Sequence, residues 1–122
     1  MTQKEILIID DNPTNLKLEK ILLSIEGYMI RTANDAEEAL KVLQSYHPQL
    51  ILMDLQLPGM SGFALTKKLK KDPIYRDIII LAVTAYAMKG DKEKALAAGC
   101  DGYITKPIDT RTFPGIIANY LA

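Results

Sequence analysis

The 122-residue sequence has no excess of charge of either sign, and it contains only one cysteine. Fifteen Lys and Arg residues balance fifteen Asp and Glu residues, so the chain lacks the electrostatic excess that binding to nucleic acid or to an anionic membrane requires. Cys100 has no partner for an internal disulfide, and no charged-then-apolar leader precedes the first apolar run. We therefore expect a reducing, cytoplasmic location. No apolar run approaches the roughly 20 residues that span a bilayer.

Internal repeats, linkers and low-complexity segments are absent as well. The chain has the length of one compact domain, and its 48% of hydrophobic residues can fill one core. A second folded domain does not fit in this length. We therefore treat residues 1–122 as a single domain.

Three apolar runs, at residues 6–9, 50–53 and 78–83, show no alternation of apolar and polar residues. A strand that is covered on one face only would alternate, so these runs predict strands that are buried on both faces of a parallel sheet. Weaker strand patterns occupy residues 28–33 and 103–105.

Helical patterns separate these strands. The first helix has Asn12 as its predicted cap, Pro13 at its first position and Gly27 as its stop. Its apolar residues on one face are Leu18, Ile21, Leu22 and Ile25.

The second helix is predicted to open at Asn34, whose spacing to Glu37 resembles a capping box, and to end near His47 and Pro48. Its inward residues are predicted to be Ala36, Ala39, Leu40 and Leu43. Further helices are predicted at residues 61–72, at 87–98, and from about Asp109 or Thr112 to Leu121. Pro114 and Gly115 would then make the last helix start late or bend it. Strands that alternate with helices at this chain length predict a doubly wound α/β fold.

Polar residues follow the predicted strands, at the edge where such folds bind their ligands. They are Asp10, Asp11, Asp54, Thr84 and Lys106. Two unit charges 4 Å apart repel by about 1 kcal/mol in water and about 4 kcal/mol at an effective dielectric constant of 20, so three carboxylates need a compensating cation. Oxygen ligands suit Mg²⁺, which would also neutralise an incoming phosphoryl group. Asp54 is then the candidate nucleophile, with Lys106 and Thr84 as partners of the phosphoryl oxygens.

Four segments of the chain resemble the receiver domain of bacterial response regulators, of the CheY-like superfamily. They are "ILIIDDN", "LILMDLQLPGMSG", "VTAYA" and "YITKPI", and the resemblance extends from Lys4 to Leu121. It implies a flavodoxin-like sheet of five parallel strands in the order 2-1-3-4-5, flanked by five helices. The run "VTAYAMKGDKEKALAAGCDGYITKPI" is particularly similar to single-domain regulators of the DivK type and to receivers of hybrid histidine kinases.

The resemblance also assigns roles to residues. It implies that Asp54 is the phosphoacceptor, and that Asp10, Asp11, Asp54 and the main-chain carbonyl of Gln56 hold Mg²⁺. Thr84 and Lys106 would bind the phosphoryl group, and a shift of Thr84 would be linked to Tyr103 in a conformational switch. The bond between Lys106 and Pro107 matches one that is often cis in receivers.

A phosphorylation-dependent switch is the function that these features favour. A histidine kinase or a histidine phosphotransfer protein would donate to Asp54, and a downstream protein would recognise the changed surface; nucleic acid and membrane are not expected partners. The chain would be a phosphoacceptor and not an enzyme that acts on other substrates. Two alternatives stay open: a phosphatase with an aspartate nucleophile, although Gln56 stands where those enzymes have a second aspartate, and a binding module that does not need phosphorylation. Loops of the type G-x-G-x-x-G or G-x-x-x-x-G-K, typical of dinucleotide or nucleotide binding, are absent.

Several other residues are given structural interpretations. His47 lies in a loop before Pro48, which does not suit a phosphodonor. Cys100 is predicted to be a small buried residue near the end of the fourth helix. The basic run of the third helix is interpreted as a solvated face; it consists of Lys67, Lys68, Lys70 and Lys71.

Overall fold

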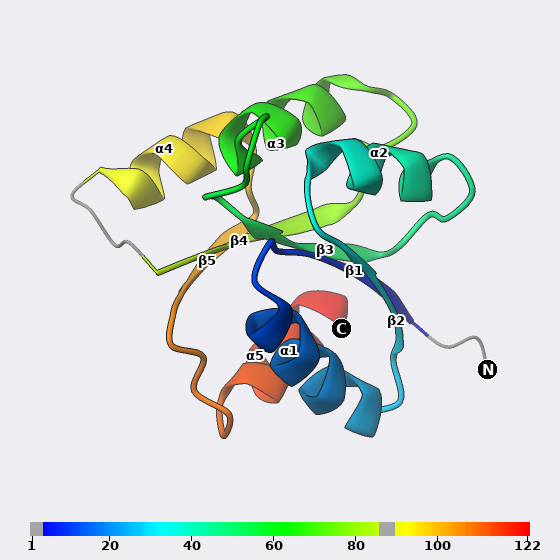
Figure 1. Cartoon of the computed structure of the whole chain (residues 1–122), viewed down its shortest axis with the longest axis vertical. Coiled ribbons are helices and arrows are strands. Elements are labelled where there is room, and N and C mark those ends of the chain that lie inside the picture. The colour runs from blue at the N-terminus through cyan, green and yellow to red at the C-terminus, as the bar shows by residue number, and fades with distance from the viewer. Residues whose placement is uncertain (1–3, 86–89) are drawn as a thin grey trace.

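Five parallel strands alternate with five helices in the computed structural model, which describes residues 4–85 and 90–122 (Figure 1). The strands lie in the order β2-β1-β3-β4-β5, which confirms the predicted fold. The elements are β1 (Glu5–Ile9), α1 (Pro13–Ile25), β2 (Met29–Ala33), α2 (Ala36–Leu43), β3 (Leu50–Asp54), α3 (Gly62–Lys71), β4 (Ile79–Thr84), α4 (Asp91–Ala98), β5 (Gly102–Thr105) and α5 (Phe113–Leu121). Among the described residues, no helix combines the length and the apolar character needed to cross a membrane.

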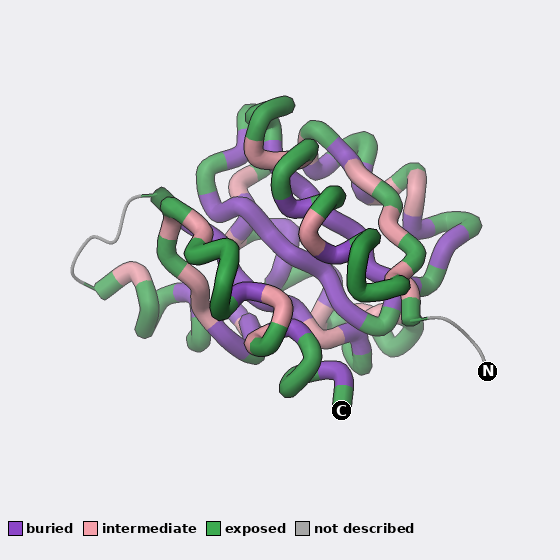
Figure 2. Tube along the Cα trace, turned by 90° about the horizontal axis from the view of Figure 1, so that it is seen from below, coloured by how far each residue is buried: buried purple, intermediate pink, exposed green. Residues whose placement is uncertain are grey.

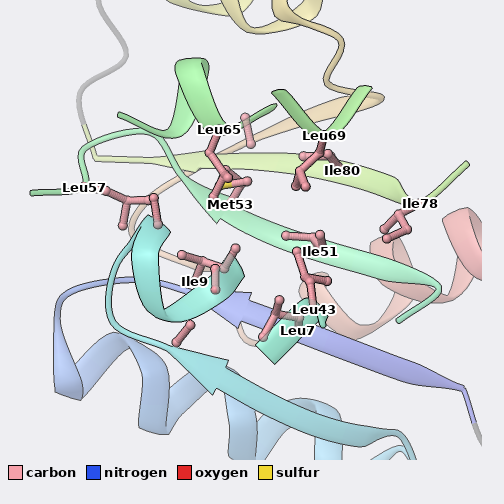
Figure 3. Close-up of a cluster of buried hydrophobic side chains, with 14 of the residues drawn as sticks. Leu7, Ile9, Leu43, Ile51, Met53, Leu57, Leu65, Leu69, Ile78 and Ile80 are labelled. Carbon is pink, nitrogen blue, oxygen red and sulfur yellow. The ribbon is translucent and has the colours of Figure 1, made fainter. Parts of the chain in front are cut away.

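The sheet separates two hydrophobic cores. Helices α2, α3 and α4 cover one face, and α1 and α5 cover the other (Figure 1). Side chains alternate between the faces along each strand, so Leu7 and Ile9 contribute to the first core while Ile6 and Ile8 contribute to the second. Figure 3 shows the first core, in which Met53 and Ile80 meet side chains of α3. The central strands are consequently the most deeply buried part of the chain (Figure 2).

The three unalternated runs are the three inner strands. β1, β3 and β4 are buried almost throughout, as predicted for strands with helices on both sides. β2 lies at an edge of the sheet, and its residues are mostly exposed or half-buried. The fold thus places the ends of β1 and β3 side by side at the centre of the sheet.

The caps of α1 agree with the prediction. Asn12 Oδ1 accepts hydrogen bonds from the backbone N–H groups of Thr14 (2.9 Å) and Asn15 (3.2 Å), and Pro13 is the first helical residue. Gly27 follows the helix with a φ of 91°, a left-handed conformation that glycine adopts without strain.

The apolar face of α1, however, is not its buried face. Of the four apolar residues predicted on this face, Leu22 is half-buried against the second core, and Leu18, Ile21 and Ile25 are 38%, 48% and 76% exposed. Glu19 and Leu23 are buried instead. The helix carries a second row of inward positions beside the apolar stripe, and tertiary packing places this second row against the sheet.

Helix α2 begins one residue later than predicted. Asp35, and not Asn34, is the N-cap: its Oδ1 accepts from the N–H of Glu38 at 2.8 Å. Glu38 in turn accepts from the N–H of Asn34 at 3.0 Å. Ala36, Ala39 and Leu43 are buried as predicted, and Leu40 is half-buried.

The starts of the last two helices bear differently on their predictions. The first predicted residues of the fourth helix, 87–89, lie outside the described residues, and α4 begins at Asp91 because Gly90 is left-handed, with a φ of 92°. α5 begins at Phe113, the later of the two predicted starts. Pro114 then falls in the first turn, where its missing N–H would have no helical partner.

The basic run of α3 is not uniformly solvated. Lys67, Lys68 and Lys71 are exposed as predicted. Lys70 instead donates to the carbonyl oxygen of Ile78 at 2.8 Å and forms an ion pair with Asp101 at 3.0 Å. It therefore joins α3 to the segments that directly precede β4 and β5.

Candidate functional site

Three carboxyl groups converge where β1 and β3 end. Asp10 and Asp11 follow β1 directly, and Asp54 is the last residue of the adjacent strand β3. Each can offer an oxygen atom, and these oxygens lie within 4.8 Å of one another. Asp10 and Asp54 are only 2% and 5% exposed, whereas Asp11 is open to solvent.

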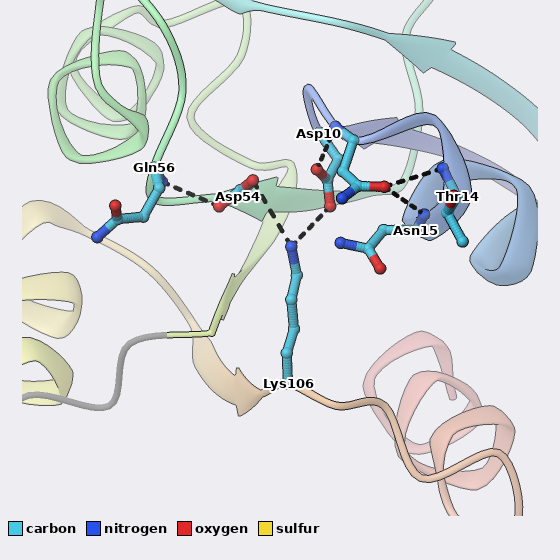
Figure 4. Close-up of polar contacts among 7 residues, drawn as sticks. Asp10, Thr14, Asn15, Asp54, Gln56 and Lys106 are labelled. Atoms are coloured by element: carbon cyan, nitrogen blue, oxygen red, sulfur yellow. Dashed lines mark hydrogen bonds and ion pairs between the residues drawn. The ribbon is translucent and has the colours of Figure 1, made fainter.

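Lys106 enters this group from the segment after β5. Its Nζ lies 2.8 Å from Asp10 Oδ2 and 3.6 Å from Asp54 Oδ2, between the two carboxylates (Figure 4). The backbone N–H of Lys106 donates to the carbonyl oxygen of Thr84 at 2.8 Å, which holds the segment against the end of β4. The bond between Lys106 and Pro107 is cis, as the resemblance implied.

Backbone N–H groups fix the other oxygen of each buried carboxylate. Asn12 N–H donates to Asp10 Oδ1 and Gln56 N–H donates to Asp54 Oδ1, each at 2.9 Å (Figure 4). Because Oδ1 of Asp54 is held in this way, its Oδ2 is the oxygen that faces Lys106. The orientation of Asp54 is therefore set by the chain that immediately follows it.

The pKa of Asp54 is raised to about 6, chiefly by burial. The hydrogen bond from Gln56 lowers this pKa, the neighbouring Asp10 raises it, and Lys106 lowers it again. The pKa of Lys106 is raised: burial acts to lower it, and the hydrogen bond to Asp10 with the charge of Asp54 outweighs that effect. One ammonium group thus compensates only part of the charge of three carboxyl groups.

A pocket of about 310 Å³ opens over these residues. It is lined by Asp10, Asp11, Asn12, Asn15, Asp54, Gln56, Ala85 and Lys106. Three carboxylates in such a pocket, with Lys106 beside them, are a donor set that fits Mg²⁺, which prefers oxygen ligands and retains several waters. The acidic triad is therefore typical of a magnesium site.

Two other predicted site residues, Thr84 and Tyr103, do not line this pocket. Thr84 ends β4 and is fully buried, and the next residue, Ala85, lines the pocket instead. Tyr103 lies half-buried on β5, where burial raises the pKa of its hydroxyl and the charges of Asp91 and Glu93 on α4 add to the effect. Tyr103 belongs to the surface between β5 and its flanking helices.

Sequence reasoning missed two residues that adjoin the site. Glu19 is buried on the inner side of α1, and Asn15 lines the pocket from the first turn of that helix (Figure 4). The position of Asn15 could have been predicted, because the cap at Asn12 places residue 15 in the first helical turn, close to the end of β1. Nothing local distinguishes Glu19 from a surface glutamate.

Comparisons with known proteins place this fold and site in one family. Residues 6–118 match the family model described as "Response regulator receiver domain", and the chain belongs to that family. It is 45% identical over 118 residues to the polar-differentiation response regulator DivK of Brucella ovis, covering 97% of this chain and 96% of that protein. The chain is thus a signalling phosphoacceptor domain similar to DivK, which decides against the phosphatase interpretation.

Solved structures agree with this assignment. A CheY-like receiver domain protein from Methanospirillum hungatei superposes with a TM-score of 0.90 at 34% identity, covering 98% of this chain and 94% of that one. The receiver domain of the sensor histidine kinase PA1611 from Pseudomonas aeruginosa superposes with a TM-score of 0.88 at 30% identity, covering 98% of both chains. That structure has a magnesium ion coordinated in its active site cleft.

Proposed function

We propose that Asp54 accepts a phosphoryl group in a Mg²⁺-dependent reaction, from a histidine kinase or a histidine phosphotransfer protein, and that this modification switches a protein-binding surface. The observation that carries the proposal is the setting of Asp54. One of its oxygens is held by the N–H of Gln56 and the other lies 3.6 Å from Lys106, inside an acidic pocket. Phosphorylation-based signalling is what the family implies.

The residues proposed to hold the metal ion are those of the acidic triad. Asp10, Asp11 and Asp54 would each supply a carboxylate oxygen, and Gln56 would add its main-chain carbonyl oxygen. When bound, Mg²⁺ supplies positive charge that reduces the repulsion between these carboxylates and the oxygens of an incoming phosphoryl group. The magnesium ion in the related PA1611 domain supports this choice of metal.

Asp54 Oδ2 is the proposed nucleophile. It forms a bond to phosphorus while the bond from phosphorus to the donor's histidine nitrogen breaks, and the electron pair of that bond stays on the nitrogen. Lys106, now 2.8 Å from Asp10, carries a charge that can pair with one phosphoryl oxygen. The hydroxyl group of Thr84 would donate to another.

The proposed switch runs from Thr84 to β5. Thr84 pairs in register with Thr105, two residues after Tyr103 on the neighbouring strand. A shift of the Thr84 side chain toward the phosphoryl group would change the space beside β5 and allow Tyr103 to move. The surface formed by β5, α4 and α5 would then differ between the two states, and a target protein would recognise one of them.

Labelling by a small phosphodonor tests this proposal. Native protein incubated with acetyl phosphate and Mg²⁺ should gain one phosphoryl group per chain by intact mass, and should lose this reactivity when a chelator removes the metal. The Asp54→Asn variant should remain unlabelled, because an amide oxygen is a far weaker nucleophile than a carboxylate. Asp77→Asn is the matched control, since Asp77 is exposed and lies far from the pocket. Equal labelling of native protein and the Asp54→Asn variant would overturn the assignment.

A further inference from the structure

Glu19 is the one glutamate among the described residues that is fully buried, with 1% of its surface exposed. It lies on α1, the helix that follows Asp10 and Asp11, one turn before the buried Leu23. The neighbouring core between α1, α5 and the sheet is apolar, and it includes Leu23, Phe113 and Ile117. An apolar residue at position 19 would suit this environment better than a carboxyl group.

The carboxyl group of Glu19 has no partner that would explain its burial. Its Oε2 is buried without a hydrogen bond, and it is the only such side-chain oxygen or nitrogen in the described part of the chain. Among the described residues, no hydrogen bond or ion pair joins Glu19 to Asp10, Asp54 or Lys106. Buried polar groups in native proteins are nearly always paired, so an unpaired one calls for a functional explanation.

The charges that act on Glu19 all belong to the acidic site. The pKa of its carboxyl group is raised to about 8. Burial is the largest cause; the charges of Asp10 and Asp54 add to it, and the charge of Lys106 opposes it. Geometry agrees with this link: Asn15 lies four residues before Glu19, on the same side of α1, and lines the acidic pocket. Glu19 in turn helps to raise the pKa of Lys106. The interaction is therefore mutual, although no direct contact is involved.

We propose that Glu19 is a positioning residue of the acidic site, a fourth carboxyl group behind the metal ligands whose charge sets how strongly the site binds a divalent cation. This inference rests on the proposed Mg²⁺ site. A negative charge at Glu19 adds to the field of the triad and strengthens cation binding, whereas an uncharged group does not. By linkage, a bound cation favours the ionised form of Glu19 and promotes release of its proton.

The test is a titration of the purified protein with Mg²⁺ alone, by isothermal titration calorimetry at several pH values from about 6.5 to 9, on both sides of the pKa near 8. In native protein, the dissociation constant should fall by roughly tenfold across this range as Glu19 ionises. Glu19→Gln and Glu19→Leu should abolish this part of the pH dependence, because neither side chain can ionise. Glu26→Gln is the matched control: it removes one negative charge from an exposed position at the other end of α1 and should titrate as native.

The outcomes are distinguishable. Groups such as Asp54 titrate in every variant, so only the difference between native protein and the Glu19 variants reports on Glu19. Circular dichroism identifies variants that fold, and the apolar Glu19→Leu retains the test if Glu19→Gln does not fold. Parallel pH profiles in native protein and the Glu19 variants would overturn this inference alone. Absence of Mg²⁺ binding by native protein at every pH would overturn the proposed metal site as well.

Discussion

At the start of α3, the chain passes so close to the end of β3 that no side chain fits. A Cβ atom on Gly62 would overlap the carbonyl oxygen of Asp54 and would lie 2.8 Å from Leu55 Cα. Both are backbone atoms, which cannot rotate away as a flexible side chain would. Gly62 also donates its N–H to the carbonyl oxygen of Leu55 at 3.3 Å. Position 62 therefore requires glycine because a Cβ atom would overlap the neighbouring backbone, and not because of its backbone angles.

Gly62→Ala should lower the free energy of unfolding by about 1–3 kcal/mol, the usual range for overpacking at a site that cannot relax. It should also slow phosphorylation by acetyl phosphate, since the segment that moves contains Asp54. Gly115→Ala is the control, because a Cβ atom there meets nothing within 4 Å and alanine favours the helix by about 1 kcal/mol. Urea denaturation measures both changes. Equal stability of native protein and Gly62→Ala would contradict the packing argument.

Single residues differ in how far the sequence reveals them. Asp10 and Asp54 could be predicted because each ends an apolar run, and the ends of adjacent parallel strands meet. Gly62 could be identified as a helix start, but its contact with Asp54 is tertiary. Glu19 could not be identified, since it lies beside the apolar stripe that periodicity predicts as the inner face of α1.

Elements were predictable where the signal was local and unique. The sequence from Asn12 to Pro13 offers one cap and one first residue, and both predictions are confirmed. At α2 two adjacent caps compete, because Asn34 and Asp35 each have a glutamate three residues later. Local spacing cannot choose between them, and the structure selects Asp35.

The rotation of α1 could not be predicted for a different reason. Two adjacent faces of α1 carry apolar residues. Which of them is buried depends on how the helix packs on the sheet and on α5. The exposed stripe of Leu18, Ile21 and Ile25 is the result. Periodicity locates a helix well, but it assigns the buried face only when one stripe is apolar and its neighbours are polar.

Lys70 shows that one residue of a basic run can connect several elements. Its Nζ donates to the carbonyl oxygens of Ile78 (2.8 Å) and Arg76 (3.3 Å) and to Asp101 Oδ2 (3.0 Å). Asp101 Oδ2 also accepts from the N–H of Ile80 at 2.8 Å. The ammonium group thus ties α3 to the segments that precede β4 and β5.

Lys70→Met should lower the free energy of unfolding by about 1–2 kcal/mol, because the aliphatic stem is kept while the part-buried carbonyl of Ile78 and the carboxylate of Asp101 lose their donor. The value is at the lower end for charged groups, since Asp101 is partly exposed and solvent screens the pair. Lys71→Met, the same change at the next and exposed residue, should be close to neutral. Thermal and urea unfolding of the two variants measure the difference. A loss of equal size in both would mean that Lys70 has no special role.

For the whole molecule, the alternation of strands and helices predicted the doubly wound class, but not which strands are neighbours. The order β2-β1-β3-β4-β5 brings together residues 10, 54 and 106, which are far apart in sequence. Strand order depends on contacts between distant segments, so only the resemblance to receiver domains supplied it. The site is consequently a property of the topology as much as of its residues.

The acidic site should also make the stability of the whole molecule depend on pH. Glu19 and Asp54 have pKa values of about 8 and about 6 in the folded state, above their ordinary values of 4.5 and 3.8. The folded state therefore holds protons that the unfolded state releases. These two groups therefore favour the folded state most below about pH 4, where both are protonated. Their contribution to the stability of the protein declines as the pH rises through the folded pKa values. The contribution of Lys106, whose pKa is also raised, is lost only at pH values above this window.

Glu19→Gln isolates one part of this dependence. Without metal, the variant and native protein should have similar unfolding free energies near about pH 3.5, because Glu19 is then largely protonated in both states. Toward pH 8 the variant should become the more stable protein, by up to about 1.4 kcal/mol for each pH unit. Urea denaturation at a series of pH values measures the difference, and Glu26→Gln controls for the loss of net charge. A constant difference across the series would show that Glu19 ionises as readily in the folded chain as in the unfolded one, and the burial of its carboxyl group would then have no electrostatic consequence.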